Sequence, residues 1–253
     1  MPQRLPGKFM WFEHLSQDVN RVKTFYDALF GWHSELVPMG DATYAMIHLG
    51  EQGIGGYRQM EVGVPNQWMS YVSVDDLDAT HATAVAAGAK ELMPPTDFGP
   101  AGRGSTIADP TGAVLSLWQN ATDDPPDLPT APAGSWCWAE LWTHDEAAAL
   151  TFYERVLGYT REAVNMGEQG TYYLLKTGDV ARAGVFKAGD PAIPTMWLPY
   201  VAVDDCDASA AKARSLGATL TMPPTDIPNV GRFAVFIDPF GATLALLKDT
   251  AQR

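Results

Sequence analysis

The chain has 253 residues, 46% of them hydrophobic, which is enough for one large domain or two ordinary ones with a substantial core. Its formal net charge of −13 disfavours nucleic acid as a partner, because nucleic-acid affinity comes largely from Lys and Arg that neutralise phosphates. No stretch approaches the ~20 apolar residues of a membrane span, so we expect a cytoplasmic protein with no membrane partner.

The first predicted unit is a strand, a helix and two further strands. The segment from Phe9 to Leu15 is typical of a strand, and the helix after it carries apolar residues at i, i+3, i+4 and i+7 from Val22 to Leu29. Gly31 ends this helix, as a glycine beyond the last turn commonly does. Strand-like stretches follow at 43–49 and 54–60.

The second predicted unit has similar elements. It opens with a strand at 70–74 and a helix that begins at Asp76 or Asp78 and ends at Gly88. Its later strands lie at 90–93, 105–108 and 114–119. The sequence DPTG forms the hairpin turn between the last two.

The second half of the chain repeats the first. MWFEHLSQDVNRVKTFYDALFGW aligns with CWAELWTHDEAAALTFYERVLGY, which pairs Glu13 with Glu140, and further on Asp75 pairs with Asp204. The runs TFY, VDD, MPPTD, DP and GA occur in the same order in both halves, which indicates a tandem duplication. One helix for every three or four strands, four times over, predicts an α+β fold.

A segment rich in proline and aspartate, NATDDPPDLPTAPAG, separates the halves. Its prolines remove backbone donors, and we expect Asp123, Asp124 and Asp127 to keep it solvated. The predicted domains are therefore 1–121 and 135–253, with a linker at 122–134. Cys137 and Cys206 are not equivalent in the two halves, so we expect two reduced core residues and no repeated disulfide.

The order of the motifs FYDALFGW, YVSVDDLDA and DPTGAVLSL resembles the vicinal oxygen chelate superfamily of glyoxalase and bleomycin resistance proteins. The resemblance extends over nearly the whole chain and occurs once in each half. The motifs WFEH/WAEL and MPPTD, and the GR before each DP turn, make the chain most similar to two-domain actinobacterial glyoxalase-like proteins. It implies four βαβββ modules in two tandem glyoxalase/bleomycin-resistance-like domains. Their sheets would curl into half-open barrels around a divalent metal.

The resemblance also places three metal ligands in each half, and neither half carries ligands of the usual kind. The positions are Trp11, Met69 and Ser116, and in the repeat Trp138, Leu198 and Ala245. Whichever modules pair, these side chains do not suit a hard or borderline divalent ion, so we expect no metal and no other cofactor. A shift of one residue in strand register would bring in His14, but its counterpart is Leu141.

Strand alternation places an acid beside aromatic rings in each predicted barrel, Glu13 beside Trp11 and Glu140 beside Trp138 and Trp142. A carboxyl group among indoles is costly to ionise, which suits a general acid or base near neutral pH. The candidate catalytic residues are Glu13, Glu140, Tyr71 and Tyr200. The candidate substrate-binding residues are Trp11, Met69, Ser116, Trp118, Trp138, Trp142, Leu198 and His48.

Each assignment has a structural alternative. Either glutamate could pair with an arginine and only fix the sheet, and the aromatic residues could be ordinary sheet core. His48, which Lys176 replaces in the repeat, could lie at a cavity rim.

Two arginines and three histidines stand outside this pattern. Arg103 and Arg232 could grip an anionic substrate, but a salt bridge to the MPPTD carboxylates Asp97 and Asp226 is favoured. The histidines left without an assignment are His33, His81 and His144.

Three functions fit these features. The first is a metal-independent lyase or isomerase that dehydrates, isomerises or cyclises an aromatic or polyketide-like small molecule. The second is a binding protein that sequesters a flat or cationic antibiotic by stacking and cation–π contacts. The third is a glyoxalase-type metal-dependent lyase with unusual ligands such as Glu13 and Glu140. Because the duplication supplies a pseudo-twofold partner within one chain, we expect a monomer.

Overall fold

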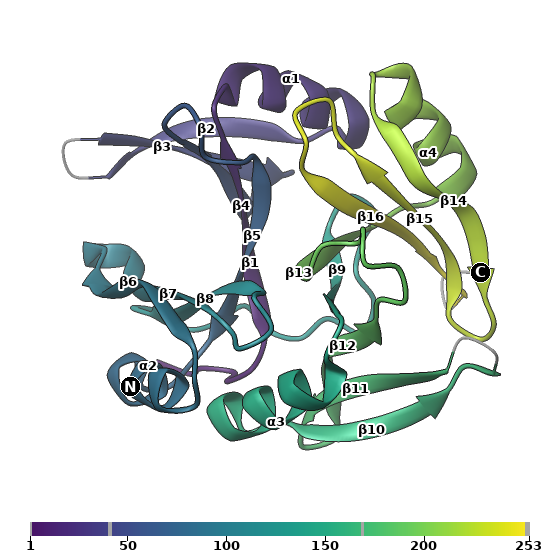
Figure 1. Ribbon diagram of the computed structural model, residues 1–253. Coiled ribbons are helices and arrows are strands. Elements are labelled where there is room, and N and C mark those ends of the chain that lie inside the picture. The colour runs from purple at the N-terminus through teal and green to yellow at the C-terminus, as the bar shows by residue number, and fades with distance from the viewer. Residues whose placement is uncertain (1, 40–41, 168–169, 251–253) are drawn as a thin grey trace. The chain divides into compact units, whose positions relative to one another are not determined.

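The computed structural model describes residues 2–39, 42–167 and 170–250 (Figure 1). Along the chain a strand, a helix and three strands follow one another, and this order occurs four times. The four βαβββ modules expected from the sequence are confirmed. No helix within the described ranges has both the length and the apolar character needed to cross a bilayer.

The first two modules form the first half of the chain. Their elements are β1 (Phe9–Ser16), α1 (Val19–Phe30), β2 (His33–Met39), β3 (Ala42–Leu49), β4 (Gln52–Gln59), β5 (Gln67–Ser73), α2 (Leu77–Ala86), β6 (Lys90–Asp97), the short 3₁₀ helix η1 (Gly99–Ala101), β7 (Gly102–Ala108) and β8 (Val114–Asn120).

The other two modules repeat this arrangement. Their elements are β9 (Trp136–Thr143), α3 (Glu146–Leu157), β10 (Thr160–Asn165), β11 (Thr171–Thr177), β12 (Val180–Lys187), β13 (Met196–Ala202), α4 (Cys206–Ser215), β14 (Thr219–Ile227), β15 (Gly231–Ile237) and β16 (Thr243–Asp249).

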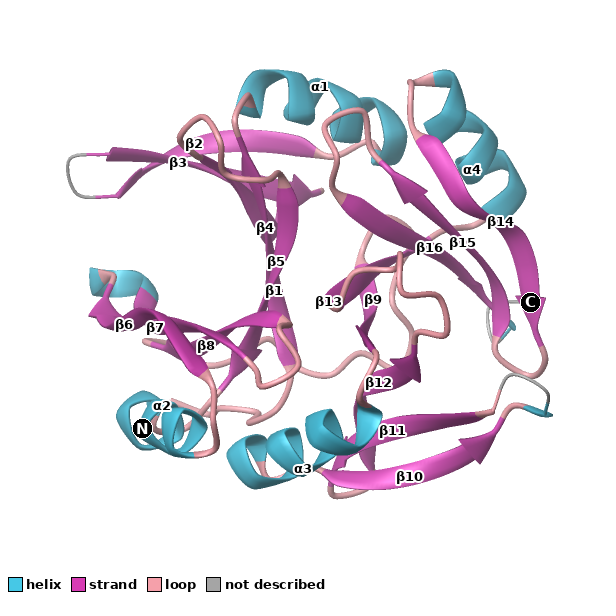
Figure 2. Cartoon of the chain, in the orientation of Figure 1, coloured by secondary structure: helices cyan, strands magenta, loops and turns pink. Residues whose placement is uncertain are grey.

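The strands form two mixed sheets, one for each half of the chain (Figure 2). The first has the order β2-β3-β4-β1-β5-β8-β7-β6, and the second has the order β10-β11-β12-β9-β13-β16-β15-β14. Each begins and ends on an edge strand, so neither sheet is closed. The predicted α+β class with tandem domains is confirmed.

The chain also divides into two compact units, and each takes one module from each half. Unit 1 comprises Met1–Trp11, Ser70–Pro126 and Trp138–Trp197, and within it α2 contacts α3. Unit 2 comprises Phe12–Met69, Asp127–Cys137 and Leu198–Arg253, and within it α1 contacts α4. Sequence repetition and compactness thus divide the chain differently, and the domain limits 1–121 and 135–253 stay a prediction.

Helix α1 shows how the local sequence sets these elements. Asp18 precedes the helix, and its carboxylate accepts a hydrogen bond of 3.1 Å from the backbone N–H of Arg21, which would otherwise lack a partner. Gly31 follows the last turn with φ +73°, a conformation that glycine adopts at little cost. The buried residues are the four expected from the periodicity: Val22, Phe25, Tyr26 and Leu29.

Two strands of the structure, β2 and β10, were not predicted from the sequence. Each is the first strand of its sheet and therefore an edge, where few side chains are buried and the apolar alternation is weak. Leu36 of β2 is 68% exposed. Pro38 lies in the same strand, where an edge tolerates the missing backbone donor.

The expectation that the linker is fully solvated was wrong for Asp124, which is buried. Its carboxylate accepts hydrogen bonds from the backbone N–H of Leu5 at 2.7 Å and from the Ser73 hydroxyl at 2.5 Å. A polar group this deep needs such partners, so Asp124 fixes the N-terminal segment to β5. Both cysteines are free, and Cys206 is buried as expected while Cys137 is partly buried.

Candidate functional site

The first catalytic candidate, Glu13, lies on β1 within unit 2 and is only 4% exposed. Arg58 of the parallel neighbour β4 donates a hydrogen bond of 2.7 Å from Nε to Glu13 Oε2, and a second from its terminal nitrogen to the same oxygen. A guanidinium held this way neutralises the carboxylate. The geometry therefore agrees with the structural alternative for Glu13.

His14 faces the opposite side of β1, as alternation requires. It is fully buried, its Nε2 lies 3.0 Å from Asp238 Oδ2, and its ring lies 5.7 Å from that of Tyr26 on α1. The side of β1 that faces α1 thus carries His14, while Glu13 belongs to the other face.

The second catalytic candidate, Glu140, lies on β9 within unit 1, in an aromatic environment. Trp142 Nε1 donates a hydrogen bond of 2.5 Å to Oε1, and the Tyr172 hydroxyl donates one of 2.7 Å to Oε2. Trp138 Nε1 in turn donates to the Tyr172 oxygen at 3.0 Å. We call Trp138, Glu140, Trp142 and Tyr172 the Glu140 cluster. Glu140 is partly exposed.

A glycine allows Tyr172 to reach the carboxylate. Tyr172 lies on β11, and Gly184 of the intervening strand β12 pairs with Glu140 in register. A Cβ atom at Gly184 would overlap the Tyr172 hydroxyl, so only glycine leaves room for the phenol to lie across β12. Burial and the neighbouring Glu140 charge raise the pKa of Tyr172 well above its ordinary value. Tyr172 therefore stays protonated and serves as a donor.

Tyr172 was not among the residues predicted from the sequence. A signal was nevertheless present, because Tyr44 and Gly56 occupy the equivalent positions of the first half. A Cβ atom at Gly56 would likewise overlap the Tyr44 hydroxyl. The presence of a tyrosine and a glycine at equivalent positions in both halves was therefore visible in the sequence, like that of Glu13 and Glu140, and could have indicated Tyr172.

Three predicted residues of the first half come together on β5 and β8 in unit 1. Tyr71 pairs with Ser116 in register, and its ring meets the Trp118 ring edge-on with centroids 5.9 Å apart. The Ser116 hydroxyl lies 2.9 Å from that of Thr106, and Trp118 Nε1 donates to Asn120 at 2.9 Å. These contacts suit either a binding wall or an ordinary core.

The other predicted residues lie in less distinctive surroundings. Met69, Leu198 and Tyr200 are buried, whereas Trp11 and His48 are partly exposed. The family's metal positions do not form a suitable donor set. Only Ser116 offers an oxygen, already in contact with Thr106, and Met69 offers a soft thioether. The residues present do not fit a hard or borderline divalent ion at these positions.

Arg103 and Arg232, each of which follows a glycine, form ion pairs. Arg232 bonds Asp226, as expected, at 3.1 Å, and also bonds Asp207 through Nε at 2.6 Å. For Arg103 the expected partner was wrong, because its two hydrogen bonds, 2.7 and 3.0 Å, go to Asp78 at the start of α2. The two terminal nitrogens of Arg103 each bond one oxygen of the Asp78 carboxylate, and guanidinium groups favour this bidentate geometry.

Comparisons with known proteins agree on one family. Residues 137–246 match the family model described as "Glyoxalase/Bleomycin resistance protein/Dioxygenase superfamily", and residues 11–118 match a "Glyoxalase-like domain". The Mycobacterium tuberculosis protein CFP32, provisionally named a glyoxylase, is 39% identical over 262 residues, 100% of both chains. The anthracycline biosynthesis protein DnrV of Streptomyces peucetius is 31% identical over 132 residues, 47% of this chain and 46% of its own.

Solved structures share the fold at low identity. The Mn(II)-bound glyoxalase of Novosphingobium aromaticivorans has a TM-score of 0.67 and 18% identity, over 96% of this chain and 82% of its own. The 2,2',3-trihydroxybiphenyl 1,2-dioxygenase of Sphingomonas wittichii has a TM-score of 0.67 and 15% identity, over 96% and 91%.

Proposed function

Because this chain belongs to the glyoxalase/bleomycin resistance protein/dioxygenase superfamily, we propose that it is a small-molecule enzyme that uses Glu140 as a general acid/base without a metal. Its reaction is a dehydration, an isomerisation or a cyclisation. The observation that carries the proposal is the pair of neutral donors, Trp142 and Tyr172, on the two oxygens of a partly exposed carboxylate.

The Glu140 cluster suits proton transfer better than the Glu13 pair. Two hydrogen bonds fix the direction of the Glu140 carboxylate, and neither donor carries a full charge. Glu13 instead forms an ion pair with the guanidinium of Arg58. In the proposed step Glu140 removes a proton from a carbon beside a carbonyl group and returns it to another carbon or to a leaving oxygen.

The substrate class proposed is an aromatic or polyketide-like small molecule. Trp138 and Trp142 lie beside the carboxylate, and the partly exposed indole of Trp138 offers a surface for stacking. The similarity to DnrV, a protein named for anthracycline biosynthesis, supports the same class of molecule. Glu13, Tyr71 and Tyr200 stay candidates for catalysis in the remaining modules, and the monomeric state and cytoplasmic location stay predictions from the sequence.

The proposal can be tested with 9(10H)-anthrone, a polycyclic ketone with an acidic proton at C10. Exchange of that proton in D₂O, followed by NMR in the presence of EDTA, should be faster with the protein than without it. Glu140→Gln should lower the enhancement at least ~100-fold, because a positioned acid/base contributes about 10²–10⁴-fold. Glu162→Gln is the matched control, since this exposed glutamate on β10 pairs with Lys176.

The outcomes separate the three functions. An enhancement that survives in Glu140→Gln contradicts the proposal. A rise in the melting temperature with anthrone but no exchange in the wild type supports the binding protein instead, because a ligand that binds only the folded state stabilises it. An enhancement that EDTA abolishes and Zn²⁺ or Mn²⁺ restores supports the metal-dependent lyase.

A further inference from the structure

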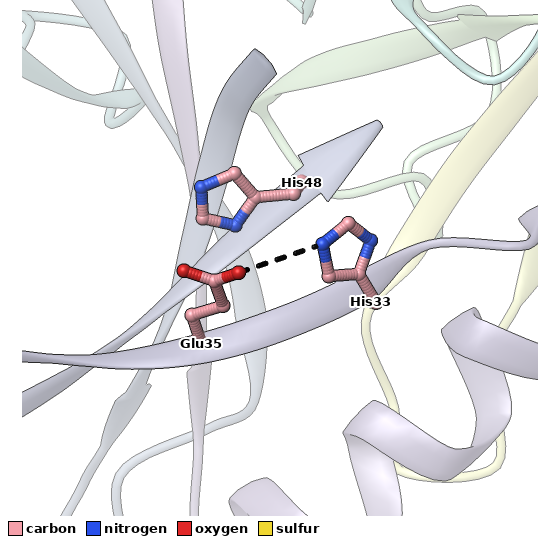
Figure 3. A group of neighbouring side chains, drawn as sticks. All are labelled: His33, Glu35 and His48. Carbon is pink, nitrogen blue, oxygen red and sulfur yellow. Dashed lines mark ion pairs between the residues drawn. The ribbon is translucent and has the colours of Figure 1, made fainter. Parts of the chain in front are cut away.

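Two histidines and a glutamate gather at the edge of the first sheet, away from the family's metal positions (Figure 3). His33 and Glu35 lie on β2, two residues apart and therefore on the same face. His48 of β3 pairs with His33 in register, which places it directly across from that residue. All three belong to unit 2.

The ligand atoms of this cluster are already close together. One atom from each residue lies within 4.8 Å of the other two, and His33 Nε2 is 3.9 Å from Glu35 Oε1. A zinc ion holds its nitrogen and oxygen ligands at about 2.1 Å in a tetrahedron, which separates neighbouring ligands by ~3.4 Å. The His33 and Glu35 side chains are 52% and 63% exposed, so both can rotate by the small amount required.

The orientation of His48 is the second, independent observation. Its Nδ1 is buried and has no hydrogen-bond partner among the residues that the structure describes. In Figure 3 that nitrogen faces Glu35 and His33. A buried imidazole nitrogen without a partner costs free energy, and a metal ion bound between the three side chains would satisfy it. The His33 and His48 rings also stack, with centroids 5.3 Å apart and planes inclined by 21°.

The second half of the chain supplies a natural comparison. Glu162 corresponds to Glu35, while Thr160 and Lys176 stand in place of His33 and His48. There Lys176 Nζ forms an ion pair of 2.9 Å with Glu162 Oε2. At this edge the second half carries the positive charge of Lys176 beside its glutamate. The first half carries two imidazoles beside Glu35, and imidazoles are common ligands of transition metals.

We propose that His33, Glu35 and His48 form a binding site for a zinc-class divalent ion, with two imidazoles and one carboxylate as ligands and water in the fourth position. Bound metal would also fasten the edge strand β2 to β3. The site is separate from the Glu140 cluster, which lies in unit 1. Its existence does not depend on the function proposed for that cluster.

The test is a titration of metal-stripped full-length protein with ZnCl₂ by isothermal calorimetry, repeated with Co²⁺ to observe its visible absorption. The wild type should bind about one equivalent of Zn²⁺. His48→Lys, which copies the residue found in the repeat, should bind at least ~10-fold more weakly, because loss of even an outer partner of a metal ligand costs 10–100-fold. Glu35→Gln should weaken binding similarly at a mostly exposed position, and circular dichroism checks that both variants fold.

A gain-of-site variant sharpens the test. Thr160→His with Lys176→His in the second half should raise the stoichiometry from about one to about two. Absence of saturable binding in the wild type overturns the proposal. Wild-type affinity in both folded variants, His48→Lys and Glu35→Gln, also overturns it, because the acidic surface alone would then hold the ion. Glu140→Gln should keep the full stoichiometry, so a failure of the proposed catalytic role can be distinguished from a failure of this site.

Discussion

Tyr26 and Asp238 lie 212 positions apart in the sequence, yet the Tyr26 hydroxyl donates a hydrogen bond of 2.9 Å to Asp238 Oδ2 inside unit 2. The Tyr26 oxygen also accepts from Trp68 Nε1 at 2.8 Å. In unit 1 the Tyr153 hydroxyl bonds Asp109 at 2.8 Å and accepts from Trp197 at 2.8 Å. The FY of the helix motif and the Asp of the DP turn are therefore structural partners that join one half of the sequence to the other.

His14→Leu tests the difference between these two networks. His14 contacts Asp238, but its counterpart Leu141 is apolar, and in unit 1 the Thr111 side chain donates to Asp109 instead. Loss of one buried partner of Asp238 should lower the free energy of unfolding by about 1–3 kcal/mol. Urea unfolding followed by circular dichroism measures this.

The compensating change is Phe240→Thr, because Phe240 stands where the other half has Thr111. Combined with His14→Leu it should restore part of the lost stability by supplying a hydroxyl donor to Asp238. If His14→Leu alone is as stable as the wild type, His14 contributes nothing to the network and this account of it is wrong.

Gly184→Ala tests the geometry of the Glu140 cluster without changing a polar group. The added methyl group must push the Tyr172 ring away, which removes its hydrogen bond to Glu140. We expect anthrone exchange to fall by ~10-fold or more, since loss of a hydrogen bond to a charged group costs about 1.5–3 kcal/mol. The fold should survive, because the neighbouring atoms belong to the end of a side chain and not to the backbone.

The matched control is Gly56→Ala, which displaces Tyr44 in the first half. Exchange should change little in this variant if Glu140 is the working residue. A larger loss in Gly56→Ala than in Gly184→Ala would point to the Glu13 module instead.

Alkaline pH should destabilise the protein through its buried tyrosines. Burial raises the pKa of Tyr26, Tyr57 and Tyr153 well above the ordinary value of 10.0. The unfolded chain therefore releases these protons near pH 10 while the folded chain keeps them, so their contribution is complete below pH 10 and is lost as the pH rises further. The melting temperature should fall steeply above this pH.

Absorbance at 295 nm, which reports tyrosinate, checks the mechanism. The buried tyrosines should ionise only together with unfolding, as measured by circular dichroism in the same samples. Tyr153→Phe removes one of these groups and should make the pH dependence shallower. Ionisation of every tyrosine before any unfolding would contradict the expected cause.

Much of the fold could be predicted because its signals are local. The periodicity from Val22 to Leu29 and the glycine at position 31 define α1, and the DP turn marks the hairpin of β7 and β8. The edge strand β2 could not be read in this way, since one of its faces carries exposed residues such as Leu36 and Pro38 interrupts its donors.

The candidate site was only partly predictable for a related reason. Comparison of the halves drew attention to Glu13 and Glu140, but not to the environments that distinguish them. Arg58 and Phe186 occupy equivalent places beside the two glutamates, and the Arg58 guanidinium bonds Glu13. His33 received no assignment because its partner His48 is distant along the chain and adjacent only across the strands.

The composition of the two compact units has a consequence for synthesis of the chain. Unit 2 needs both Phe12–Met69 and Leu198–Arg253, so its earliest residues must wait for the last quarter of the chain to leave the ribosome. Unit 1 likewise needs residues as far as Trp197. The first module therefore spends most of translation without its partner module, and the core of unit 1 can be completed before that of unit 2.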